Sequence, residues 1–70
     1  MDVKRLGKVI RAARTARGWS QEELARRVGV TQGHISLVER GVKTPSVGVL
    51  VRLFSELGLS MEMLKEAPHA

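Results

Sequence analysis

The sequence predicts an all-α domain, a bundle of four to five short helices, and three observations lead to this fold class. Apolar residues recur at helical spacing, hydroxyl residues stand where helices would begin, and glycines stand where they would end. With 70 residues and no cysteine, the chain has room for one hydrophobic core and no disulfide framework. We therefore expect one domain over residues 1–66 and a flexible tail over 67–70, around Pro68.

The first helix is predicted over roughly residues 2–17, and Gly18 is expected to end it. Its apolar residues fall at i, i+3, i+4 and i+7, which places them on one helix face. They are Leu6, Val9, Ile10 and Ala13.

Three further helices are predicted, and each begins after a hydroxyl residue whose oxygen can accept a hydrogen bond from the first turn. Each also stops at a glycine, which readily adopts the left-handed conformation of a helix end. The N-caps are Ser20, Thr31 and Ser46, and the stops are Gly29, Gly41 and Gly58. The expected apolar face of the last helix is Val47, Leu50, Leu53, Phe54 and Leu57.

The start of the second helix has two additional signals. Ser20 and Glu23 have the spacing of a capping box, in which each side chain accepts a hydrogen bond from the backbone of the other. Trp19 and Leu24 are placed to pack on each other as a hydrophobic staple.

Positive charge is concentrated at the N-terminus. Twelve Lys and Arg against seven Asp and Glu give a net charge of +5. A concentrated positive field attracts polyanions, so nucleic acid is the leading partner class; on charge alone, a solvated basic face is an equal alternative. A membrane surface is less favoured because the first helix has no aromatic anchor. The cations of residues 1–17 are Lys4, Arg5, Lys8, Arg11, Arg14 and Arg17, against the single acid Asp2.

The sequence argues against an enzyme. His34 and His69 have no metal-ligand spacing, and no glycine-rich phosphate loop follows a strand. Glu22 and Glu23, as helix neighbours, point apart. We expect no catalytic residue, no metal and no cofactor. No apolar run approaches the length of a membrane span, so a cytoplasmic protein is expected.

The two helices between residues 21 and 40 have the pattern of a helix-turn-helix. Ala25 is small where the helices would approach closely, and Gly29 supplies the sharp turn between them. The apolar positions that would seat both helices on the core are Leu24, Val28, Val30, Ile35 and Val38. The small and polar residues of the second of these helices then project together, as a helix entering a major groove requires.

This pattern resembles the phage-repressor-like helix-turn-helix domains, known as the XRE or Cro-type family. The similarity covers nearly the whole chain and rests on residues 18–25, 28–32, 35–36, 39–41 and 45–46. It implies a lambda-repressor-like bundle that binds double-stranded DNA sequence-specifically and regulates transcription.

The resemblance also implies site residues. Gln32 is the principal base reader, whose amide pairs with adenine in bidentate fashion, while Gln21 contacts phosphate and braces Gln32. Arg14 and Glu39 match a structural ion pair that joins the first helix to the recognition helix. The other base-reading candidates are Gly33, His34, Ser36 and Leu37, and the other phosphate-binding candidates are Arg40, Lys43 and Thr44.

Three of these assignments have alternatives. Leu37 suits a thymine methyl group or belongs partly to the core, and Ser36 suits a phosphate or a base edge. Arg40, Lys43 and Thr44 are otherwise ordinary surface residues.

The segment over 59–66 departs from the commonest pattern of this family. With Ser60 as N-cap it forms a fifth helix, but its apolar and polar residues alternate as in a strand, which is slightly favoured. HipB-type antitoxins end in a similar stretch that forms an intermolecular two-stranded sheet, and an isolated strand needs such a partner. In either form we expect the dimer contact at Leu59, Met61, Met63 and Leu64.

Dimerisation is also expected because one recognition helix reads only a few base pairs. The predicted protein is a homodimeric repressor of a palindromic operator, acting at the nucleoid of a bacterium or in a phage-infected cell. The alternative is an antitoxin that binds a toxin protein, such as a HipA-like kinase, and autoregulates its operon. The few residues after Glu66 favour the stand-alone repressor, or an antitoxin that binds its toxin through the folded body of the domain.

Overall fold

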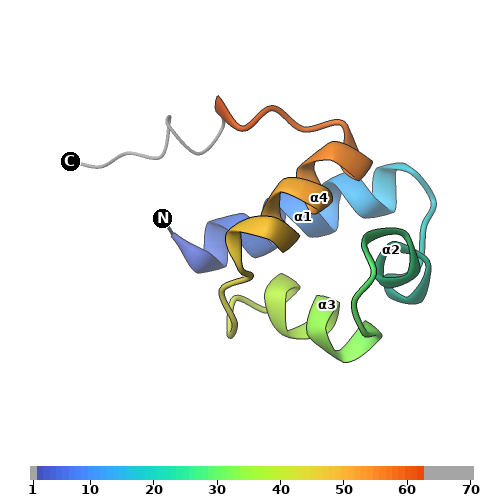
Figure 1. Ribbon diagram of the computed structural model, residues 1–70, viewed down its shortest axis with the longest axis horizontal. Helices are drawn as coiled ribbons and strands as arrows, with labels where there is room; N and C mark the ends of the chain where they lie inside the picture. Colours follow the sequence, from blue (N-terminus) through green and yellow to red (C-terminus); the bar gives the residue numbers. More distant parts are fainter. Residues whose placement is uncertain (1, 63–70) are drawn as a thin grey trace.

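The computed structural model describes residues 2–62, which form four α-helices and no strand (Figure 1). The helices are α1 (Val3–Ala16), α2 (Gln21–Val28), α3 (Gln32–Glu39) and α4 (Val47–Leu57). α1 and α4 pack side by side, and α2 and α3 pack on each other beneath them. The predicted all-α bundle is confirmed. No helix in residues 2–62 is long and apolar enough to cross a membrane.

One hydrophobic core lies where the four helices meet. Ile10, Leu24, Ile35 and Leu53 each expose 0% of their surface, so every helix contributes a fully enclosed side chain. The other members of the core cluster are Leu6, Ala25, Val28, Val49, Leu50, Phe54 and Leu57. With no disulfide available, burial of this apolar surface is the main stabilising term of the domain.

The predicted apolar face of α4 is wrong at Val47. Val47 is 76% exposed, whereas Val49 is 8% exposed and belongs to the core. The two valines lie at opposite edges of the face centred on Leu53 and Leu57. Phe54, seven residues after Val47 and on the same edge, is 2% exposed, so the difference lies along the helix: Val47 is the first residue of α4, and periodicity does not tell how far the cover extends toward the helix end.

All four helices begin at a side-chain cap. Ser20, Thr31 and Ser46 each accept a hydrogen bond from the backbone N–H three residues later, at 3.0, 3.1 and 3.2 Å, as predicted. Asp2 is the N-cap of α1, where the sequence led us to expect a helical residue; its Oδ1 accepts from the N–H groups of Lys4 and Arg5. The predicted glycine stops are confirmed, because Gly18, Gly29, Gly41 and Gly58 all have φ between 67 and 77°.

The capping box at α2 forms only in part. The Glu23 carboxylate pairs with Arg26 and, at 2.8 Å, with Arg27 Nε, instead of accepting from the Ser20 backbone. Charge-assisted hydrogen bonds are stronger than a bond to a neutral N–H, and these arginines lie within one turn. The Arg26 guanidinium accordingly holds the pKa of the Glu23 carboxyl below its usual value. Trp19 is half-buried against the core, with the Arg27 guanidinium 4.0 Å above its ring.

The C-terminal segment is described as far as Glu62. Leu59 packs partly against the core, and Ser60 Oγ accepts a hydrogen bond from the Glu62 backbone at 3.1 Å. None of residues 59–62 is in a strand. Met63, Leu64 and the predicted tail over 67–70 lie outside the described residues, so the choice between a fifth helix and a dimerising strand stays a prediction.

α1 and α3 approach each other closely at Gly7. A Cβ atom on Gly7 would lie 2.5 Å from both the Val38 and Glu39 carbonyl oxygens. Since these are backbone atoms, a larger residue at this position has to push the two helices apart. Glycine at position 7 therefore determines how tightly α3 is held against α1.

We predict that Gly7→Ala destabilises the domain by about 1 to 3 kcal/mol, because the added methyl overpacks the α1–α3 contact. Thermal unfolding followed by circular dichroism measures this. Gly48→Ala is the matched control, because a Cβ on Gly48 of α4 meets nothing within 4 Å and alanine favours a helix. An unfolding temperature that rises in both variants would show that α1 and α3 are not in contact at Gly7.

Candidate nucleic-acid interface

The outer face of α3 gathers the residues predicted to contact DNA bases. Ile35, Val38 and Glu39 are buried, and the helical repeat therefore turns the remaining positions of α3 toward solvent. Of these, Gln32 and Gly33 are exposed, and His34, Ser36 and Leu37 are half-buried.

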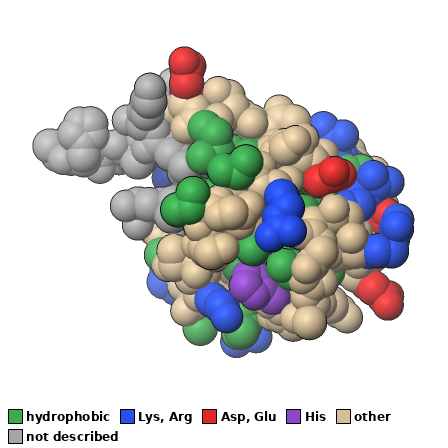
Figure 2. All heavy atoms as spheres, in the orientation of Figure 1, with side chains coloured by type: hydrophobic (Ala, Val, Ile, Leu, Met, Phe, Trp, Pro, Cys, Tyr) green, Lys and Arg blue, Asp and Glu red, His purple; other side chains and the backbone are tan. Residues whose placement is uncertain are grey.

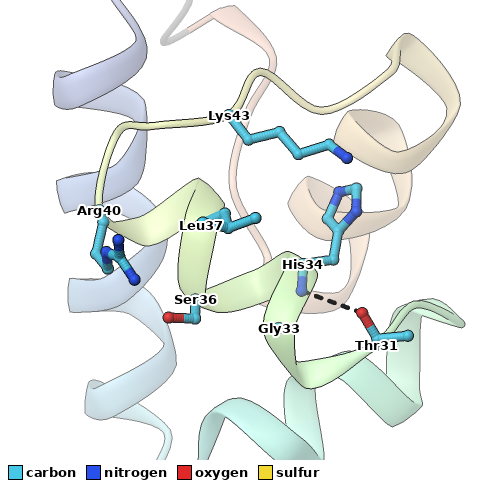
Figure 3. Close-up of a pocket in the computed structure, with 7 residues that line it drawn as sticks. All are labelled: Thr31, Gly33, His34, Ser36, Leu37, Arg40 and Lys43. Carbon is cyan, nitrogen blue, oxygen red and sulfur yellow. Dashed lines mark hydrogen bonds between the residues drawn. The ribbon is translucent and has the colours of Figure 1, made fainter.

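Most of these residues line one open hollow of about 470 Å³ on the surface (Figure 3). His34 and Lys43 lie on one side of it, Ser36 and Arg40 on the other, and Leu37 between them. The lining residues are Thr31, Gly33, His34, Ser36, Leu37, Arg40 and Lys43. Gln32 and Thr44 are exposed but do not line it, and Thr31 joins it although the sequence suggested only a capping role for Thr31.

Gly33 leaves the centre of this face without a side chain. A Cβ there would meet only Thr31 Oγ1, at 4.0 Å, and the backbone of Gly33 is not in the left-handed region. Neither the conformation nor the packing of the domain therefore requires glycine, which disfavours a helix by roughly 0.5–1 kcal/mol relative to alanine. What the glycine provides is access to the α3 backbone from outside.

The His34 side chain is only partly available to a ligand. Its backbone N–H donates to the Thr31 cap at 3.1 Å, and its Nε2 is buried without a hydrogen-bond partner. A base contact through Nε2 requires the imidazole to turn out of its present position. The sequence placed His34 on the groove face but gave no sign of this orientation.

The predicted ion pair between Arg14 and Glu39 is present and buried. Arg14 Nε lies 2.6 Å from Glu39 Oε2, and Arg14 Nη2 lies 3.1 Å from Oε1. The side chains are 11% and 3% exposed, and Arg14 Nη1 also donates to the Trp19 carbonyl at 2.7 Å. The pair thus joins α1, the start of α2 and the end of α3.

Gln21 belongs to the same network. Its Nε2 donates to Glu39 Oε1 at 3.1 Å, and no hydrogen bond joins it to Gln32 in the described part of the chain. A carboxylate is a stronger acceptor than a neutral amide, which explains why the amide of Gln21 turns to Glu39. Gln21 therefore braces the end of α3, where the resemblance had implied a brace on Gln32.

The comparisons with known proteins agree with this geometry. The Helix-turn-helix family model matches residues 10–64, which includes α2 and α3. The chain belongs to the XRE-type helix-turn-helix family of DNA-binding transcriptional regulators.

Curated relatives of this helix-turn-helix chain bear the same description. The uncharacterized HTH-type transcriptional regulator y4dL of Sinorhizobium fredii is 48% identical over 52 residues, which are 74% of this chain and 26% of that protein. The HTH-type transcriptional regulator SinR of Bacillus subtilis is 32% identical over 91% of this chain and 59% of its own length. The chain thus spans only about a quarter of one relative and three fifths of the other.

Solved structures of helix-turn-helix regulators have the same fold. The restriction-modification controller protein C.AhdI from Aeromonas hydrophila superposes with a TM-score of 0.79 at 34% identity, covering 84% of this chain and 89% of that one. SinR in complex with DNA superposes with a TM-score of 0.77 at 31% identity, covering 87% and 98%. The family model and these relatives point to DNA-binding transcription regulators.

We predict that Arg14→Ala or Glu39→Ala lowers the free energy of unfolding by about 3 to 5 kcal/mol, because each strands the other charge in a buried site. Chemical denaturation checks this. The control is Arg26→Ala, since Arg26 pairs with Glu23 on the surface, where its side chain is 70% exposed, and should change stability by less than about 1 kcal/mol. Equal effects at the two sites would contradict a buried, mutually dependent pair.

Proposed function

We propose that the chain acts as a homodimeric repressor that binds a palindromic operator, with α3 in the major groove. The observation that carries this proposal is the distribution of charge on the α3 face. Between Gln32 and Leu37 every outward residue is small or neutral, and the cations Arg40 and Lys43 stand at the C-terminal edge. Neutral donors and acceptors suit base edges, whereas cations suit the phosphates beside the groove.

The likeness to SinR supports the choice of DNA. The solved SinR structure holds that protein in complex with DNA, and its fold superposes on nearly all of this chain. Within this proposal Gln32 reads a base, and Leu37 contacts a thymine methyl. Gln21, Arg40, Lys43 and Thr44 hold phosphates. A protein bound in this way across a promoter represses by occupying it.

A second copy is part of the proposal because one α3 helix reads too few base pairs to select a site in a genome. Apolar side chains gather over α4 and the segment that follows it (Figure 2). The large apolar residues exposed in this part of the chain are Val47, Val51 and Met61, and Met61 is 41% exposed. Two recognition helices then enter successive major grooves about 34 Å apart. The alternative of an antitoxin finds no support among the relatives named above. Action on a chromosomal operator places the protein at the nucleoid, in the cytoplasm.

The base-reading role of Gln32 is tested by titrating labelled duplex from the gene's own promoter, and a scrambled duplex of equal length, with the wild type and with Gln32→Ala. We expect the variant to lose roughly 1 to 3 kcal/mol of preference for the promoter, with nonspecific affinity unchanged. Ser55→Ala, an exposed polar change on α4, is the control and should keep the preference. A wild type that binds both duplexes equally would exclude an operator in that promoter.

The dimer contact is tested at Met61, because Leu59 also packs on the core and its replacement would affect folding. We expect Met61→Asp to shift the wild-type dimer toward monomer in sedimentation equilibrium, since a carboxylate is costly to bury between two copies. Val42→Asp introduces the same charge at another exposed apolar residue and should leave the dimer intact. If Met61→Asp and Val42→Asp dimerise with equal strength, Met61 is not part of the dimer contact.

A further inference from the structure

Three cations of α1 form a strip that the site described above does not include. Lys4, Lys8 and Arg11 recur at i, i+4 and i+7, so they lie on one face of the helix, and all three are exposed. None of them is in an ion pair in residues 2–62, where the paired arginines are Arg14, Arg26 and Arg27. Acidic side chains accompany the basic ones at the α2 end of the molecule (Figure 2). The charge of the α1 strip is therefore available to a polyanion.

The strip lies directly beside the C-terminal end of α3. Gly7, which touches the Val38 and Glu39 carbonyls, is the helix-surface neighbour of both Lys4 and Arg11. A second contact confirms the placement at Lys4, because a Cβ on Gly41 would lie 2.9 Å from Lys4 Cα and 2.8 Å from its Cγ. Lys4 therefore lies next to the turn that ends the recognition helix, and Lys8 and Arg11 continue the strip along α1.

The strip also lies on a definite side of α3. Along α1, Leu6 and Ile10 lie to one side of Gly7 and enter the core, whereas the three cations lie to the other side. Across the α3 face, Arg40 is on the side of Ser36, opposite Lys43 and His34 (Figure 3). The strip therefore lies on the flank of α3 that is away from the core. Lys43 lies on the other flank, in the loop that leads to α4.

We infer that Lys4, Lys8 and Arg11 form a second phosphate-binding strip, which holds the DNA strand on the flank of α3 opposite Lys43. The inference rests on the proposed insertion of α3 into a major groove, since a helix in that groove has a sugar-phosphate backbone on each side. Arg40 and Lys43 lie on opposite sides of α3, so these two residues alone leave each side of the groove with a single cation. The strip supplies affinity without sequence information, because phosphates are the same at every base pair.

The test compares two double variants that each remove two positive charges. Lys4→Gln with Arg11→Gln removes charge from the strip, and Arg5→Gln with Arg26→Gln removes it from exposed positions outside the strip. Promoter and scrambled duplexes are titrated between about 50 and 200 mM salt. The salt slope is the decrease of the logarithm of the binding constant with the logarithm of the salt concentration, and each lost phosphate contact lowers it by about 0.9. The strip variant should lose about two units of slope on both duplexes. The loss of affinity between the lower and the higher salt concentration is then roughly tenfold smaller than in the wild type. The control should keep the wild-type slope.

Two further measurements keep the outcomes distinct. The separate double variant Lys4→Arg with Arg11→Lys preserves both charges and should keep the wild-type slope. If the two side chains only stabilised the fold, their charge alone would not be enough to keep it. Unchanged unfolding temperatures establish that the glutamine variants fold. The proposed function stands if the wild type prefers its promoter and Gln32→Ala loses that preference. If the strip and control variants then have equal salt slopes, the strip inference alone is overturned. A wild type without salt-dependent binding overturns both.

Discussion

The buried junction between α1 and α3 is the constraint on which the recognition surface depends. Gly7 lets the two backbones touch, and the Arg14–Glu39 pair joins them through charge. The donors of Arg14 are shared between Glu39 and the Trp19 carbonyl, and Glu39 also accepts from Gln21. A buried charge is tolerated only when it is paired and hydrogen-bonded in this way. One network therefore fixes the end of α3 relative to both α1 and α2, and with it the orientation of the face that we propose for DNA binding.

On the α3 face, the residues suited to affinity and those suited to specificity occupy different places. The centre of the face is neutral and contains Gly33 and Leu37, and the cations stand at its edges. With α3 in the major groove as we propose, changes at the centre should alter which base pairs are preferred, while changes at the edges should alter how strongly any duplex is held. The separation allows the two properties to vary independently within one small domain.

Much of this fold was predictable because the signals were local. Caps at Ser20, Thr31 and Ser46 and stops at the glycines depend on chemistry within four residues of the chain, and the structure has all of them. The errors arose where a distant partner decides the outcome. Val47 differs from Val49 only by what covers it, and the amide of Gln21 turns to Glu39, eighteen residues away in sequence. Likewise, the outward-facing residues of α3 followed from periodicity, but the buried Nε2 of His34 depends on tertiary packing.

The open space over Gly33 has a consequence for how new binding preferences arise. A side chain added at this position would project from the first turn of the recognition helix into solvent, meeting only the Thr31 hydroxyl. The domain would fold as before, since nothing in its interior changes. Position 33 is thus a site where a single codon change can introduce a new group for base contact without loss of stability. If α3 reads an operator as we propose, descendants or designed variants of this protein can change their operator preference through position 33 before any other part of the scaffold has to adapt.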